Sequence, residues 1–212
     1  MQIPQADQPV LRLPPLWLLV FITALAPIGM NGVLPANTAV MHDLNTTYSS
    51  AQMVLSIYLA ASMLSQIILG NLADRIGRRP VMIGSLAIFG AGSVVCAIAP
   101  NIEILWLGRF IQGFGSAVCM FLTRTILRDV HTKDKAASAI GYMVTAMMIA
   151  PLFAPALFGW LTDVSSWRNM YIVLAVVGFG LALLCIRFQH ETLTDAQKPC
   201  LLYTSPSPRD RG

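Results

Sequence analysis

Charged residues are scarce in this sequence. Asp, Glu, Lys and Arg make up 11% of the 212 residues, while 56% are hydrophobic and the mean hydropathy is strongly positive. Such a balance is expected of a chain that is surrounded by lipid rather than water, and it argues against a large soluble domain. The net charge of +4 predicts attraction to anionic lipid headgroups and requires no nucleic acid.

Arrangements of residues that carry chemistry are also missing. His42, His131 and His190 are isolated in predicted loops, and no nucleophile stands beside a base with an orienting acid. No glycine-rich loop that could hold a phosphate follows a strand, and the cysteines in apolar stretches lack metal-ligand spacing. We therefore predict no enzymatic activity, no cofactor and no metal site.

Long apolar runs dominate the rest of the chain. A helix needs about 20 mainly apolar residues to cross the hydrocarbon core. Six runs have this length: about 16–37, 51–69, 80–99, 102–122, 137–161 and 169–188. They predict an all-α membrane protein with six transmembrane helices in residues 16–190. A cleaved signal peptide is the alternative for the first run, but no small-x-small site closes it.

Basic residues gather on one side of the predicted spans, and this sets the orientation. This side holds Arg12, Arg75, Arg78, Arg79, Arg128, Lys133, Lys135, Arg187 and Lys198, and the other holds His42, Asp43, Glu103, Asp163 and Arg168. The positive-inside rule then makes both ends cytoplasmic, with residues 1–15 as a tail and 191–199 as the start of a central loop.

The last residues have a different character. Residues 200–210, CLLYTSPSPRD, look like the conceptual translation of a transposase adapter used in preparing sequencing libraries. We interpret 200–212 as an artefact, with an ordinary disordered tail as the alternative. On the first interpretation the natural sequence continues past Pro199 and this chain is an amino-terminal fragment.

The most informative segment joins the second and third runs: residues 70–80, GNLADRIGRRP. The chain must reverse tightly there while its arginines stay in water, and Gly77 can supply a positive φ. This segment resembles the signature between the second and third helices of the major facilitator superfamily. The resemblance implies a conformational latch between two transporter halves, made of Gly70, Asp74, Arg75, Gly77, Arg78 and Arg79. A generic basic turn is the alternative.

The fourth run contains an arginine about two turns inside it. Residues 107–115, LGRFIQGFG, place Arg109 where a charge costs about 3 kcal/mol on insertion scales, so it should face the bundle interior and find partners. An arginine that reaches the outer interface beside Glu103 is the alternative. The segment resembles the fourth-helix motif of the superfamily. Arg109 would then bind an anionic group or tune the proton affinity of a carboxylate, with Gln112 beside it.

Two further segments resemble drug-exporting members. Residues 122–129, LTRTILRD, resemble the end of this helix in bicyclomycin-resistance-type exporters, so we expect Arg124 and Arg128 to form an ion-pair cluster with Asp74. Residues 141–159 resemble the antiporter motif. Pro151 and Pro155 should bend this helix, and Gly159 leaves room for a neighbour, although packing alone is the alternative.

The first run departs from that branch at one position. Residues 30–36, MNGVLPA, resemble its first-helix motif, but Asn31 stands where relatives usually carry an aspartate. No Asp or Glu lies well inside any run, so proton coupling would come from a missing half, from Asp43 or Asp163, or not at all. The predicted substrate contacts are Asn31, Arg109, Gln112, Tyr142 and Met143, because methionine and aromatic walls suit lipophilic ligands.

These features together resemble the amino-terminal six-helix half of a major facilitator drug exporter. The resemblance implies export of a lipophilic small molecule across the bacterial inner membrane by alternating access, as a multidrug/proton antiporter. Its partners would be membrane lipids and the missing carboxy-terminal half. The alternatives are a sugar or metabolite exporter and a stand-alone six-helix membrane scaffold.

Overall fold

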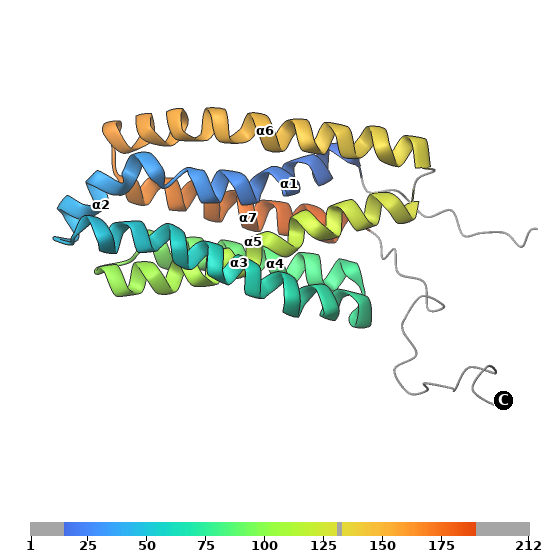
Figure 1. The fold of residues 1–212 in the computed structure, drawn as a ribbon, viewed down its shortest axis with the longest axis horizontal. Coiled ribbons are helices and arrows are strands. Elements are labelled where there is room, and N and C mark those ends of the chain that lie inside the picture. Colours follow the sequence, from blue (N-terminus) through green and yellow to red (C-terminus); the bar gives the residue numbers. More distant parts are fainter. Residues whose placement is uncertain (1–14, 131–132, 190–212) are drawn as a thin grey trace, which may run out of the picture.

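The computed structural model describes residues 15–130 and 133–189, and these form helices joined by short turns (Figure 1). The elements are α1 (Leu16–Asn31), η1 (Leu34–Ala36), α2 (Asn37–Asp43), α3 (Tyr48–Ile76), α4 (Arg78–Ala97), α5 (Ile102–Val130), α6 (Lys133–Val164) and α7 (Trp167–Phe188). The predictions for residues 1–14, 191–199 and 200–212 lie outside the described residues.

Six helical stretches in the described part are long and apolar enough to span a membrane, as predicted. The first stretch, Leu16–Asp43, combines α1, η1 and α2. Pro35 cannot donate a backbone hydrogen bond, and the α-helix ends four residues before it, at Asn31. The first span is therefore interrupted within its length, which the sequence prediction of a single run did not include.

The segment at residues 70–80 is more helical than predicted. Helix α3 continues through Ile76 and α4 begins at Arg78, so the predicted loop is wrong and the reversal takes place at Gly77. Gly77 has φ 106° and ψ 156°, which confirms the predicted positive φ. The helix continues because Leu72, Ala73 and Arg75 favour helix, and because water at a membrane surface does not stop helical hydrogen bonding.

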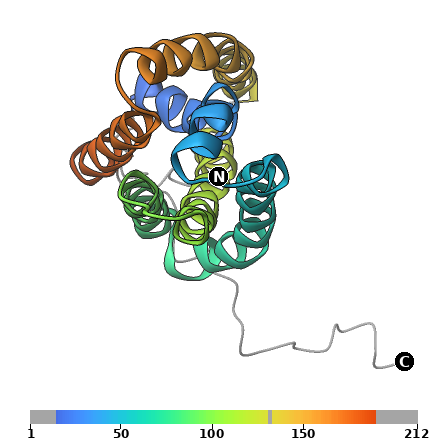
Figure 2. The same cartoon turned by 90° about the vertical axis from the view of Figure 1, so that its left-hand side faces the viewer.

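Close backbone approaches hold α5 against α3 and α4. A Cβ atom at Gly113 would lie 2.4 Å from the carbonyl oxygen of Tyr58, and one at Gly92 would lie 2.3 Å from the amide nitrogen of Gln112. Small residues of this kind let membrane helices pack tightly. In the end-on view of Figure 2, α5 lies among the other helices, and one face of it, which includes Arg109, Gln112 and Ser116, is buried in the bundle.

Helix α6 is the least buried of the candidate spans. Only 11% of its most apolar stretch is buried inside the bundle. Met148 and Leu152 on this helix are more than 70% exposed. Large apolar side chains that face outward along a helix suit a hydrocarbon environment and would promote aggregation in water.

Candidate functional site

Arg109 lies at the centre of a buried polar network. Its side chain is 0% exposed and comes from the fourth span, α5. Nη1 donates to the carbonyl oxygen of Gly29 on α1 at 2.9 Å, and Nε donates to that of Val54 on α3 at 3.3 Å. One side chain therefore joins three helices, and the prediction that Arg109 faces the interior and finds partners is confirmed. The alternative position beside Glu103 is wrong.

A second set of contacts extends this network. Arg109 Nη1 also donates to Gln112 Oε1 at 2.7 Å, and Gln112 Nε2 donates to Ser93 Oγ on α4 at 2.7 Å. The guanidinium carbon lies 4.4 Å from the ring centroid of Tyr58 and 5.9 Å from that of Tyr171. The network thus reaches α7 as well, so five of the six spans contribute to it.

The charge of Arg109 is balanced without a carboxylate among the described residues. Gly29 is two residues from the end of α1, where helix carbonyls carry a partial negative charge. That carbonyl, the carbonyl of Val54 and the face of the Tyr58 ring supply the negative electrostatic environment. Arg109 Nη2 has no hydrogen-bond partner among the described residues, so the site retains an amino group whose N–H donors an anionic or carbonyl group could use.

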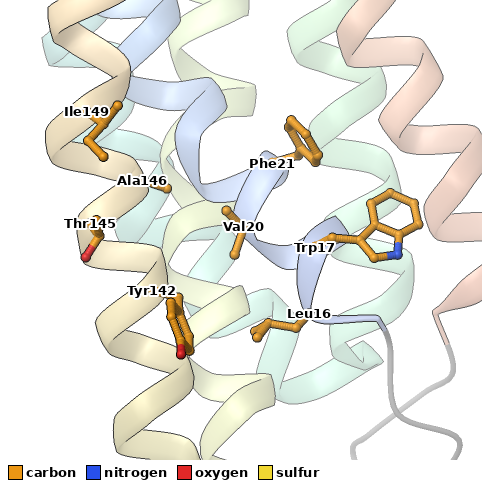
Figure 3. Close-up of a pocket in the computed structure, with 8 residues that line it drawn as sticks. All are labelled: Leu16, Trp17, Val20, Phe21, Tyr142, Thr145, Ala146 and Ile149. Carbon is orange, nitrogen blue, oxygen red and sulfur yellow. The ribbon is translucent and has the colours of Figure 1, made fainter.

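The five predicted substrate contacts do not converge in this conformation. Arg109 and Gln112 lie together, whereas Asn31 turns back on its own helix and donates from Nδ2 to the carbonyl oxygen of Pro27 at 2.9 Å. On α6, Met143 is fully buried, but its neighbour Tyr142 is 64% exposed and belongs to a separate groove (Figure 3). Tyr142 therefore does not line a common cavity with Arg109.

The predicted ion-pair cluster at the other end of α5 is not formed among the described residues. Asp74 is exposed and makes no ion pair there, and Arg124 Nη2 contacts Met147 Sδ at 3.5 Å instead. Arg128 is exposed. Arg124 therefore points from α5 towards α6.

The arginines of the α3–α4 turn have separate environments. Arg75 is exposed, as predicted, but Arg78 is only 8% exposed, so the prediction that it stays in water is wrong. Arg79 is half-buried and donates from Nη2 to the carbonyl oxygen of Ile186 on α7 at 2.8 Å. The turn is thereby attached to the end of the sixth span.

Helix α6 contains both predicted prolines, Pro151 and Pro155. One turn later, a Cβ atom at Gly159 would meet Pro35 at 3.5 Å, an ordinary packing distance. A Cβ at Gly32 would lie only 2.6 Å from the ring of Phe158. The end of α6 therefore packs closely on the interrupted part of the first span.

The sequence prediction missed a polar cluster at the end of the bundle that lies opposite the α3–α4 turn. Arg168 Nη1 pairs with Asp43 Oδ2, and Arg168 Nη2 donates to the carbonyl oxygen of Ala99 at 3.1 Å. Trp167, 2% exposed, donates from Nε1 to the same carboxylate oxygen at 3.1 Å. The only sequence signal was the presence of opposite charges at the ends of two runs on one predicted side.

The described residues thus form a six-span helical bundle with a buried, positively charged polar centre and no group of three or more metal-ligating side chains. This defines a multi-pass membrane protein. The model of the Major Facilitator Superfamily matches residues 19–200, and the chain belongs to this family of membrane transporters.

Curated relatives include transporters named for drug resistance. The chain is 29% identical over 188 residues to Multidrug resistance protein D of Escherichia coli (strain K12), which covers 88% of the chain and 48% of that protein. It is 29% identical over 189 residues to Multidrug resistance protein MdtL of Escherichia coli O45:K1 (strain S88 / ExPEC), with 89% and 47% covered. The uncharacterized MFS-type transporter YdgK of Bacillus subtilis (strain 168) is 32% identical over 184 residues, with 86% and 46% covered.

Solved structures show the same fold. The human organic anion transporter MFSD10 (TETRAN) superposes with a TM-score of 0.70 at 16% identity, which covers 86% of this chain and 49% of that one. A peptide transporter in complex with sulfate gives 0.70 at 21% identity, with 86% and 41% covered. The chain spans about half the length of the curated relatives it matches.

Proposed function

We propose that this chain is the amino-terminal half of a secondary active transporter that exports lipophilic small molecules across the bacterial inner membrane. The observation that carries the proposal is the similarity, along nearly the whole chain, to two proteins named for multidrug resistance. The buried Arg109 network supports it, because an intramembrane charge that is held away from lipid is characteristic of substrate and ion pathways.

The second half of the proposed transporter would complete both the site and the cycle. Alternating access requires two halves that move around a central site, and the chain spans about half of its relatives. Arg109 and Gln112 would face that centre, and Asn31, Tyr142 and Met143 would become substrate contacts only after helices move or the other half binds.

The latch remains part of this proposal. Asp74 lines a small notch of 290 Å³ on α3 and α5 together with Gln66, Asn71 and Phe121. An exposed carboxylate without an ion pair among the described residues can accept hydrogen bonds from a helix amino terminus in the other half. Arg75, Arg78 and Arg79 would keep the adjacent turn at the cytoplasmic surface, which makes both ends of the native segment cytoplasmic.

Coupling to protons would need an acid outside the spans of this half. Asn31 cannot carry a proton in the physiological range. We propose that a proton antiporter of this kind holds its titrating carboxylate in the second half.

The test uses the full-length gene in a drug-sensitive bacterial strain, with growth inhibition by a panel of lipophilic antibiotics and ethidium efflux as measurements. Export predicts a fourfold or greater rise in at least one inhibitory concentration. Arg109→Ala and Asp74→Arg should abolish it, whereas Leu152→Ala, on the exposed face of α6, should not. No change for any drug would favour a sugar or metabolite exporter.

Reporter fusions that place Arg78 outside the cell would refute the proposed orientation.

A further inference from the structure

A groove with an apolar lining opens on the side of the bundle between α1 and α6 (Figure 3). Its volume is about 480 Å³, within the range of small-molecule sites. The lining residues come from the first two turns of α1 and one face of α6: Leu16, Trp17, Val20, Phe21, Tyr142, Thr145, Ala146 and Ile149.

The polar atoms in this lining leave the groove itself apolar. Thr145 Oγ1 donates to the carbonyl oxygen of Gly141 on its own helix at 3.0 Å, so its hydroxyl is already used. Trp17 packs edge-to-face on Phe21 at 6.4 Å and on Phe188 of α7 at 6.3 Å between ring centroids. These aromatic contacts hold one wall in place and connect the groove to the end of the sixth span.

Two exposed basic residues belong to helix ends at one end of the groove. Arg187 is exposed and directly precedes Phe188, whose ring meets that of Trp17. Lys135 is exposed on α6, seven residues before Tyr142. Seven residues are two helical turns, so Lys135 lies on the same face of α6 and about 10 Å nearer its start. The first residues of α1, the first turns of α6 and the last turn of α7 lie at the same end of the bundle (Figure 1).

We propose that this groove binds one anionic phospholipid, with an acyl chain along the apolar lining and the headgroup between Lys135 and Arg187. The charge at the rim selects an anion, and the lining is almost entirely apolar, which suits an acyl chain. Trp17 and Tyr142 are amphipathic residues of the kind enriched where acyl chains meet headgroups. The site does not depend on transport. Only the leaflet, the cytoplasmic one, rests on the proposed orientation.

The experiment uses the purified chain in a nonionic detergent, titrated with phosphatidylglycerol or phosphatidylcholine of identical acyl chains. Native mass spectrometry counts retained lipids, and thermal unfolding reports stabilisation. Ala146→Phe fills the groove, while Lys135→Gln and Arg187→Gln remove the rim charges. The matched controls are Gly180→Phe, which fills the separate α4–α7 groove, and Arg75→Gln, an exposed base on α3.

We expect the wild-type chain to retain one phosphatidylglycerol and to unfold at a higher temperature with it than with phosphatidylcholine. Ala146→Phe should lose both effects, and each glutamine variant at the rim should weaken apparent affinity about fivefold, with the controls unchanged. Equal responses to the two lipids, or a full response in Ala146→Phe, would overturn the proposal. So would a dimer of the wild-type chain that Ala146→Phe dissociates, because the groove would then hold a second copy.

A measurement without mutation guards against a variant that fails to fold. A photoactivatable phosphatidylglycerol, added to the wild-type chain, should label peptides that contain residues 16–21 or 142–149. Labelling spread evenly over all outward faces would indicate ordinary surrounding lipid and would refute a specific site.

Discussion

The pair of Arg109 and Gln112 provides the sharpest test of what holds the bundle together. Arg109→Met has a similar length and removes the donors to Gly29, Val54 and Gln112 in a site that is closed to water. Gln112→Leu removes the acceptor of one of these bonds and the donor to Ser93. The two changes together form a double-mutant cycle around the 2.7 Å contact.

The expected magnitude follows from these contacts. Each lost hydrogen bond costs about 0.6 kcal/mol, the average that double-mutant cycles give for membrane proteins. Loss of the cation–π contact with Tyr58, at 4.4 Å, adds about 1–2 kcal/mol in a desolvated site. Relief of a buried charge offsets part of this. We expect Arg109→Met to destabilise the chain by about 2 kcal/mol, with a coupling to Gln112 of about 1 kcal/mol.

The assay is equilibrium unfolding in mixed micelles, titrated with sodium dodecyl sulfate and followed by far-ultraviolet circular dichroism. Thr125→Val is the control partner, because the half-buried Thr125 donates to the carbonyl oxygen of Phe121 on its own helix at 3.1 Å and lies about 24 Å along α5 from Arg109. Its effect should add to that of Arg109→Met without coupling. A coupling to Gln112 below about 0.3 kcal/mol, or an Arg109→Met chain as stable as the wild type, would refute the reasoning.

Three further predictions use the same unfolding assay. Gly77→Ala should lower the free energy of unfolding by about 1–3 kcal/mol, because φ 106° disfavours a side chain. Gly70→Ala should be neutral or slightly stabilising, because a Cβ there meets nothing within 4 Å. Equal effects of the two changes would contradict this prediction. Gly113→Ala should cost about 1–3 kcal/mol, because its Cβ would lie 2.4 Å from a backbone oxygen of α3, and an unchanged midpoint would show that α3 can shift. Asp43→Arg and Arg168→Asp should each destabilise the chain by about 1–2 kcal/mol, and the double variant with exchanged charges should recover part of this loss. No recovery would show that the contacts with Trp167 and Ala99, and not the ion pair, stabilise this end of the bundle.

The latch segment shows how far motif and local chemistry reach. The sequence predicted the position and the backbone conformation of Gly77, because a reversal between two spans needs a residue that tolerates positive φ. It predicted a longer loop than the structure has, since charged residues were taken to end the helix. It also predicted partners for Asp74 that the described residues do not supply, because the rotation of α5 about its axis decides where Arg124 points.

The polar contacts at the two ends of the bundle illustrate the same limit. Asp43 and Arg168 are 125 residues apart, and only the tertiary fold, which brings the end of α2 near the start of α7, makes them a pair. Tyr142 and Met143 are adjacent in sequence, yet one is exposed in a lateral groove and the other is buried. A residue type suited to ligand binding does not reveal which of these environments it will occupy.

The sequence alone determined the class of the molecule: six apolar helices, the tight reversal at Gly77 and the burial of Arg109 follow from local hydropathy, sterics and the cost of a charge in hydrocarbon. The tertiary structure alone decided which carbonyls and rings surround Arg109, where the lateral groove lies and which charges pair. The physical reason is that lipid and protein interior are both apolar. A membrane helix therefore carries little amphipathic pattern to mark its inward face, and only packing against its neighbours fixes its rotation.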